Sequence, residues 1–287
     1  MKSSNPVFTR SEGFNGRGSS NAHGNQTYPG GGMTYPAYGS GASTGQGGPT
    51  TIDPTTDRGP MTIDTVVQKT GISLGVVVLV AAATWVVTGE VTQESIATLY
   101  VLGLVGALVG FGLSMANSFK KLVSPGLVLA FAVAEGVFVG AFSKALEYTF
   151  GDGQGGLVIG AVLGTVAAVA GTLAAYKFFD IQVTPKFRKF VVAAMFGFVA
   201  LALLDFVLSF FGAAVGFNGF GPLGLIMSVV GLVIGIFMLI LDFDFVERGI
   251  AAGLPEVESW RAAFGLTVTI VWIYIEILRI LAILRGD

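Results

Sequence analysis

The chain has 287 residues, of which 53% are hydrophobic and only 12% are charged, and its net charge is −2. A soluble globular protein carries about 25% charged residues, and so small a net charge gives no basic field for a nucleic-acid partner. Cysteine is absent and the one histidine, His23, lies in a polar tail, which excludes disulfides, thiolate nucleophiles, HExxH metallopeptidases and Ser–His intramembrane proteases.

The N-terminal segment, residues 1–60, is rich in Gly, Asn, Ser, Thr and Pro and holds few aliphatic side chains. Such a segment cannot bury enough apolar surface to offset the entropy lost on ordering it. It has neither the apolar core of a signal peptide nor the arginines of an amphipathic presequence. We predict a disordered cytoplasmic tail at 1–60, followed by a membrane domain at 61–287.

Apolar runs follow one another through this second part of the chain. A helix that spans a bilayer needs about 20 mostly apolar residues. Closely spaced glycines in the second and fourth runs favour a tightly packed bundle. We therefore predict an all-α integral membrane protein, embedded in the lipid bilayer by seven transmembrane helices. The predicted spans are 70–89, 95–117, 123–146, 154–176, 189–212, 222–245 and 261–284.

Seven spans place the two termini on opposite sides of the membrane, and the basic residues predict which side is which. With the N-terminus in the cytoplasm, only Lys144 and Arg285 lie outside, whereas ten Lys and Arg residues lie near the membrane on the inside. This difference is a strong positive-inside bias. We predict a multi-pass protein of the plasma membrane with a cytoplasmic N-terminus and an external C-terminus. The ten inside residues are Arg58, Lys69, Lys120, Lys121, Lys177, Lys186, Arg188, Lys189, Arg248 and Arg261.

Four ionisable side chains lie well inside the predicted spans, namely Glu135, Asp205, Glu276 and Arg279, while Asp242 and Asp244 are borderline at the end of the sixth span. Each costs a few kcal/mol to insert, so each needs an explanation. Glu276 and Arg279 are three residues apart and can form an ion pair along one helix face. Glu135 is open to two interpretations, a hydrogen bond that serves packing or a functional role. Asp205 is also open to two interpretations. It could line a polar vestibule or bond to a helix end, or it could take part directly in transport.

The stretch "LDFDFVERG" (241–249) brings two aspartates together at the end of the sixth span. Asp242 and Asp244 are two residues apart, about 200° around a helix with 3.6 residues per turn, so they cannot both face the inside of the bundle. Asp242 is the first charge after the uncharged run 206–241. We predict that Asp242 faces inward and that Asp244 belongs to the solvated helix end with Glu247 and Arg248.

Four short stretches occur in the order and spacing of a known membrane-protein family. They are "AEGVFVG" around Glu135, "SFKKLVSPG" after the second span, "FMLILDFDFV" in the sixth span and "IYIEILRILAILR" in the last. With the seven spans they resemble the Bax inhibitor-1-like (transmembrane Bax inhibitor motif) family over about residues 61–287, and "MKSSNPVF" is similar to a bacterial branch with Gly-rich tails. The chain departs from the family in having Glu276 where Asp is usual. The segment 246–260 is also longer than in the family, and it could form a short amphipathic helix on the cytoplasmic face.

The resemblance implies a bundle in which the last helix is enclosed by the other six, with acids of helices 6 and 7 close together. Asp242 and Glu276 take those positions, which requires the sixth helix to extend past Asp242 toward Gly249. The family is associated with a pH-sensitive calcium leak. Two carboxylates in contact share a proton, because ionising both is costly, and oxygen ligands suit Ca²⁺. We predict Asp242 and Glu276 as pH sensor and Ca²⁺ ligands, with Lys120 or Lys121 as a cationic latch on the closed state.

Two other functions stay open at this point. Acids on helices 6 and 7 would suit an intramembrane aspartyl protease, but the Gly-x-Gly-Asp signature is missing around Glu276, where the sequence reads Tyr-Ile-Glu-Ile. We expect no enzyme activity and no cofactor. The protein could instead be a non-conducting membrane protein that binds and modulates a membrane protease or another complex, with its tail as a docking segment. The oligomeric state is open as well.

Overall fold

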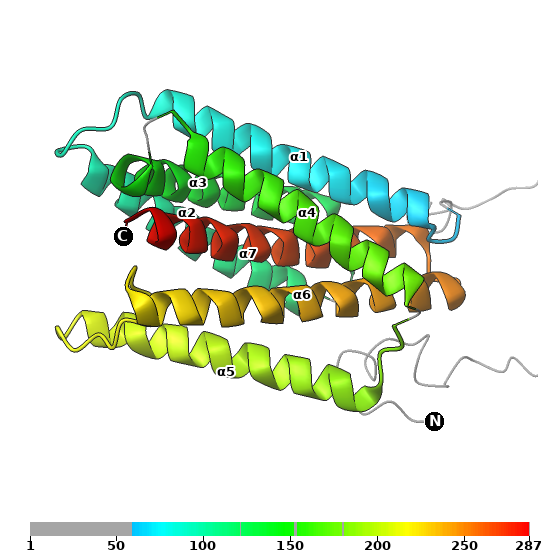
Figure 1. Ribbon diagram of the computed structural model, residues 1–287. Coiled ribbons are helices and arrows are strands. Elements are labelled where there is room, and N and C mark those ends of the chain that lie inside the picture. The colour runs from blue at the N-terminus through cyan, green and yellow to red at the C-terminus, as the bar shows by residue number, and fades with distance from the viewer. Residues whose placement is uncertain (1–58, 121, 152–153, 180, 287) are drawn as a thin grey trace, which may run out of the picture. The chain divides into compact units, whose positions relative to one another are not determined.

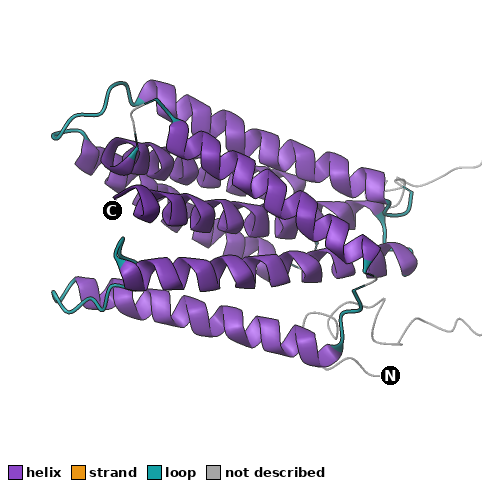
Figure 2. Ribbon diagram, in the orientation of Figure 1, coloured by secondary structure: helices purple, strands orange, loops and turns teal. Residues whose placement is uncertain are grey.

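The structure is a computed structural model that describes residues 59–286 except 121, 152, 153 and 180. This part of the chain folds into seven long α-helices and one short 3-10 helix (Figure 1, Figure 2). The predicted tail at 1–60 falls almost entirely outside the described residues. The helices are α1 (Ile63–Val87), α2 (Ile96–Phe119), α3 (Pro125–Phe150), α4 (Gly156–Phe178), α5 (Pro185–Ser209), α6 (Pro222–Ala251), η1 (Glu256–Glu258) and α7 (Ser259–Gly286).

Each of the seven α-helices is long and apolar enough to cross a membrane, so the prediction of an all-α protein with seven spans is confirmed. Local sequence signals set several helix starts. Pro125, Pro185 and Pro222 open α3, α5 and α6, where a proline loses no helical hydrogen bond. Thr62 caps α1 through a capping box with Thr65, which satisfies backbone N–H groups that the helix leaves unpaired.

The segment between the last two long helices differs from its prediction. The expected amphipathic helix at 246–260 is wrong, because α6 itself continues to Ala251. Gly253 then turns the chain with a φ of 64°, a left-handed conformation that glycine adopts without strain. η1 follows and leads directly into α7. The extension of the sixth helix past Asp242 is confirmed.

The helices alternate in direction, which gives the bundle two distinct ends (Figure 1). We call one the basic end. It carries the starts of α1, α3, α5 and α7 and the ends of α2, α4 and α6, and with them Lys69, Lys120, Lys177, Lys186 and Arg248. The opposite end carries the α1–α2, α3–α4 and α5–α6 connections. This arrangement agrees with the alternation on which the predicted topology rests, while the side that faces the cytoplasm stays a prediction.

The last helix, α7, lies inside the bundle, but the predicted enclosure by all six other helices is only partly realised. It packs against α1, α3, α4 and α6, whereas α2 packs mainly on α3 and α5 mainly on α6. In Figure 1 the helices run side by side along their length, with α6 between α7 and α5. Four helices are therefore the principal neighbours of α7, and α2 and α5 take outer positions.

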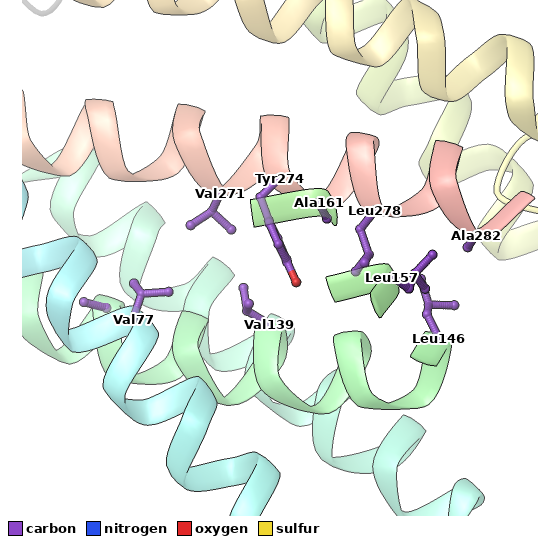
Figure 3. Packing of buried hydrophobic residues seen from close by; sticks show 10 residues of the cluster. Val77, Val139, Leu146, Leu157, Ala161, Val271, Tyr274, Leu278 and Ala282 are labelled. Carbon is purple, nitrogen blue, oxygen red and sulfur yellow. The ribbon is translucent and has the colours of Figure 1, made fainter. Parts of the chain in front are cut away.

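The largest apolar cluster joins α7 to α1, α3 and α4 (Figure 3). Tyr274 points from α7 toward α3, where its hydroxyl shares a 2.7 Å hydrogen bond with the Ser143 hydroxyl. A phenol buried among apolar side chains normally finds such a partner. The labelled members of the cluster are Val77, Val139, Leu146, Leu157, Ala161, Val271, Tyr274, Leu278 and Ala282.

The start of α1 is fastened to the α6–α7 connection at the basic end. Met61 is fully buried, and its backbone N–H donates to the Leu254 carbonyl at 2.7 Å. One turn and a half along α1, the buried Lys69 ammonium lies 2.8 Å from the Glu256 carboxylate. These contacts explain why α1 begins at Ile63 and not at residue 70, since they satisfy polar groups that would otherwise end an apolar span.

The close contact of α1 with α3 depends on Gly140, and it gives a first prediction. A Cβ atom at Gly140 would lie 2.6 Å from the Ala81 carbonyl oxygen, whereas a Cβ at Gly75 of α1 would meet nothing within 4 Å. Gly140→Ala should therefore destabilise the bundle by about 1–3 kcal/mol through overpacking. Gly75→Ala should instead stabilise it by up to about 1 kcal/mol, because alanine is the better helix former. Thermal unfolding of the two variants in detergent measures the contrast, and equal shifts in Tm would contradict the packing of α1 on α3.

Candidate functional site

The α6–α7 interface carries Asp242 toward the basic end. The Thr269 hydroxyl of α7 donates a 2.6 Å hydrogen bond to the Asp242 carboxylate, and the side chain is half-buried. Gly265, one turn before Thr269, faces the same carboxylate, since a Cβ there would lie 3.5 Å from its Oδ1 atom. Asp242 therefore faces α7, as predicted.

Glu276 lies deeper in the same interface, toward the opposite end. Its carboxylate fills the space beside Gly231 of α6, where an added Cβ would lie only 2.6 Å from Oε1. Arg279 lies one turn further along α7, with Nη1 at 3.5 Å from Glu276 Oε2, and both side chains are buried. Arg279 also donates to the carbonyls of Phe217 and Gly219 in the α5–α6 connection, at 3.2 and 3.4 Å. The ion pair read from the three-residue spacing is present.

The structure does not bring Asp242 and Glu276 together. Asp242 is level with Thr269, seven residues before Glu276 on α7, and Glu276 is level with Gly231, 11 residues before Asp242 on α6. At 1.5 Å per residue these offsets place the two carboxyls about 10–16 Å apart along the bundle. The predicted contact is wrong because it needs α6 and α7 to be shifted along each other by two to three turns. In this arrangement the two carboxyls cannot share a proton or ligate one Ca²⁺ ion, and no group of three His, Cys, Asp or Glu side chains gathers among the described residues.

Asp244, which we expected at a solvated helix end, is 7% exposed. It is held between two arginines: Arg188 Nη2 of α5 lies 2.6 Å from Oδ2, and Arg248 Nε of α6 lies 2.9 Å from Oδ1. We call Asp244, Arg188 and Arg248 the arginine clamp. The prediction failed because it treated the basic residues after Asp244 as solvated, whereas the start of α5 covers the acid. The four-residue spacing of Asp244 and Arg248 was the available signal.

Of the two lysines predicted as a cationic latch, the structure describes Lys120, which lies away from Asp244 and the α6–α7 interface. Lys120 is exposed at the end of α2, and α2 packs mainly on α3. Lys121 lies outside the described residues. The cations that face an acid of α6 are Arg188 and Arg248, from α5 and from α6 itself.

A polar pocket of about 510 Å³ lies next to the arginine clamp, between the ends of α4 and α6 and the α4–α5 connection. Tyr176 of α4 donates a 2.7 Å hydrogen bond to the Glu247 carboxylate within it. Lys177, Gln182 and Arg248 also line it. Of the candidate acids, Asp244 lines it.

Asp205 and Glu135 take separate positions. Asp205 of α5 is buried and accepts hydrogen bonds of 2.7–2.9 Å from the N–H groups of Val215, Gly216 and Asn218. It thus orders the α5–α6 connection, the same connection that Arg279 contacts. Glu135 of α3 is half-buried and faces α2, where a Cβ at Gly110 would lie 3.0 Å from its Oε2 atom.

Two buried charges near the end of α3 were missed by the sequence analysis. Lys144, placed there in an outside loop, donates to the carbonyls of Trp85 and Gly89 at the end of α1 and to the Thr88 hydroxyl. Glu147 accepts N–H groups at the start of α4, including that of Leu157 at 3.0 Å. Both complete helix ends, where unpaired backbone groups and the helix dipole favour these charges. No sequence pattern predicts them, because their partners are backbone atoms of other helices.

A bundle of seven apolar helices, with carboxylates at three depths along its sixth and seventh helices, defines a multi-pass integral membrane protein with charged groups in its interior. Comparison of the sequence with known protein families identifies the family of this chain. A family model described as Bax inhibitor 1 like matches residues 5–286, and the chain belongs to this family. No curated protein matches the chain in sequence. The predicted resemblance to this family is therefore confirmed for the chain as a whole.

Proposed function

We propose that the protein is a proton-responsive cation leak, permeable to Ca²⁺, with its basic end facing the cytoplasm of the cell that carries it in its plasma membrane. The observation that supports this function is the set of carboxylates on α6 and α7, of which Asp242 and Glu276 lie in the α6–α7 interface and Asp244 lies where α6 meets α5. Asp244 is at the basic end, Asp242 lies next along α6, and Glu276 lies in the opposite half. Acids at such depths are costly unless they line a path or bind a partner, and their oxygens suit Ca²⁺.

The described conformation corresponds to a closed state in this proposal. Leu239 of α6 and Ile273 of α7 are fully buried between the levels of Asp242 and Glu276, so an apolar layer separates the two acids. An ion would pass only if α6 moved relative to α7 or α5. Since α5 packs mainly on α6, the arginine clamp between these two helices is the contact best placed to restrain such a movement.

The proton response follows from the charges of the clamp. Protonating Asp244 would remove the one negative charge between Arg188 and Arg248, and the two guanidinium groups would then repel each other. Acid on the basic side would thus loosen α5 from α6 and raise the flux. The acid pair foreseen from the resemblance is replaced by the Asp244 clamp as the gate, with Asp242 and Glu276 as groups on the path. The proposal includes no catalytic activity, because an aspartyl dyad needs two carboxyls in contact.

The test is Ca²⁺ flux into liposomes that contain the purified full-length chain, measured at neutral and acidic pH. Asp242→Asn and Glu276→Gln should each lower the flux several-fold, since each removes a charge that attracts the cation along the path. Asp64→Asn is the matched control, because Asp64 is an exposed acid at the same end, on α1. If both path variants keep the flux of the unsubstituted protein, the leak along α6 and α7 must be abandoned.

A further inference from the structure

The polar pocket at the basic end has an excess of available positive charge. Two carboxylates line the pocket, Asp244 and Glu247, and the Tyr176 hydroxyl that donates to Glu247 brings no positive charge. The cations Lys177 and Arg248 line it too, and Arg188 of the arginine clamp adds a third, so three cations face two carboxylates. The Lys177 side chain is exposed, and no hydrogen bond or ion pair joins it to another described side chain. The Arg248 side chain is 55% exposed despite its contact with Asp244. A ligand that enters this pocket therefore meets two accessible cations, which favours an anion.

The chain that borders the pocket is both basic and aromatic. Residues 177–190 read KFFDIQVTPKFRKF, with four basic residues and one acidic residue, a net charge of +3. Three phenylalanines in this stretch are largely exposed, Phe178 at 84%, Phe179 at 79% and Phe190 at 62%. They flank the end of one spanning helix and the start of the next. Aromatic rings exposed at the ends of spanning helices insert among the lipid acyl chains, and the neighbouring basic groups reach the lipid headgroups.

We propose that this pocket binds the phosphate of an anionic membrane phospholipid. Lys177 and Arg248 would contact the phosphate oxygens, and Phe178 and Phe179 would contact the acyl chains. Basic pockets between spanning helices bind acidic lipid headgroups in this way. The exposed rings favour a lipid over a soluble phosphate, because rings that insert among acyl chains hold the neighbouring pocket at the level of the lipid headgroups.

The test uses the thermal unfolding of the full-length chain in a zwitterionic detergent. Phosphatidylglycerol should raise the Tm in a concentration-dependent manner, as a ligand that binds only the folded state does. Phosphatidylcholine and sn-glycerol 3-phosphate should not. Lys177→Glu should remove most of the shift and Lys177→Gln part of it, since Lys177 supports no contact of the fold. Lys120→Glu reverses an exposed charge at the same end, outside the pocket, and should keep the full shift.

Three outcomes would overturn the proposal. An equal shift in Lys177→Glu and in the unsubstituted protein would place the lipid elsewhere. A loss as large in Lys120→Glu would indicate general attraction to the basic end. A shift with glycerol phosphate as large as that with phosphatidylglycerol would mean that the pocket takes a soluble phosphate. Because no flux is measured, these results are independent of the proposed leak.

Discussion

Asp244→Asn should raise the Ca²⁺ flux at neutral pH and abolish its increase in acid. The substitution keeps the shape of the side chain but removes the charge that holds Arg188 and Arg248. If the clamp favours the closed state by about 1–2 kcal/mol, its loss raises the open population about 5–30-fold. The variant would behave at neutral pH as the unsubstituted protein does in acid, because the protonated and the amide side chains are both neutral.

The fold should survive this change. The side chains of Arg188 and Arg248 are 36% and 55% exposed, so water can hydrate both when Asp244 loses its charge. The loss of stability should then be on the order of 1 kcal/mol, as for partly exposed ion pairs. A large effect on flux with a small effect on Tm would separate a gate from a structural support.

Glu247→Gln is the matched control for the clamp. Glu247 lies on the next turn of α6, borders the same pocket and pairs with Tyr176 and not with the clamp. Its neutralisation should leave the flux and its pH response unchanged. If Asp244→Asn stays closed at neutral pH and still responds to acid, Asp244 is not the gate.

The sequence was sufficient for the seven spans because each is a long apolar run, and a bilayer imposes that signal directly. It was less informative about where a span continues into polar residues. Lys69 and Ser259 are buried at the starts of α1 and α7, and only their partners, Glu256 and Thr65, explain why the helices extend that far.

The positions of the candidate residues were also predictable only in part. The direction in which Asp242 points was predictable, because rotation around a helix follows from residue number. The level of Asp242 relative to Glu276 was not, because it depends on how far α6 and α7 are shifted along each other, and no local pattern encodes that offset. Asp244 was misplaced for a related reason: its burial depends on Arg188, which is 56 residues away in the sequence.

Arg279→Gln should cause the largest loss of stability among the substitutions considered. It leaves the Glu276 carboxylate buried beside Gly231 without its cation. Breaking a buried ion pair by removing one partner costs about 3–5 kcal/mol, and we expect the lower end of this range because Nη1 and Oε2 are 3.5 Å apart. Thermal unfolding in detergent measures the loss. The variant should regain stability as the pH falls, because protonation neutralises the stranded Glu276.

The double variant Glu276→Gln/Arg279→Gln distinguishes two roles for Arg279. If its main role is to neutralise Glu276, the double variant should recover most of the lost stability, since no buried charge remains unpaired, and the two substitutions should be non-additive by about 1–3 kcal/mol. If its main role is to hold the Phe217 and Gly219 carbonyls of the α5–α6 connection, the double variant should be as unstable as Arg279→Gln alone, and acid should rescue neither. The first result would support a path along which Glu276 is a charged group balanced by Arg279. The second would make Arg279 the support of the connection that Asp205 also orders.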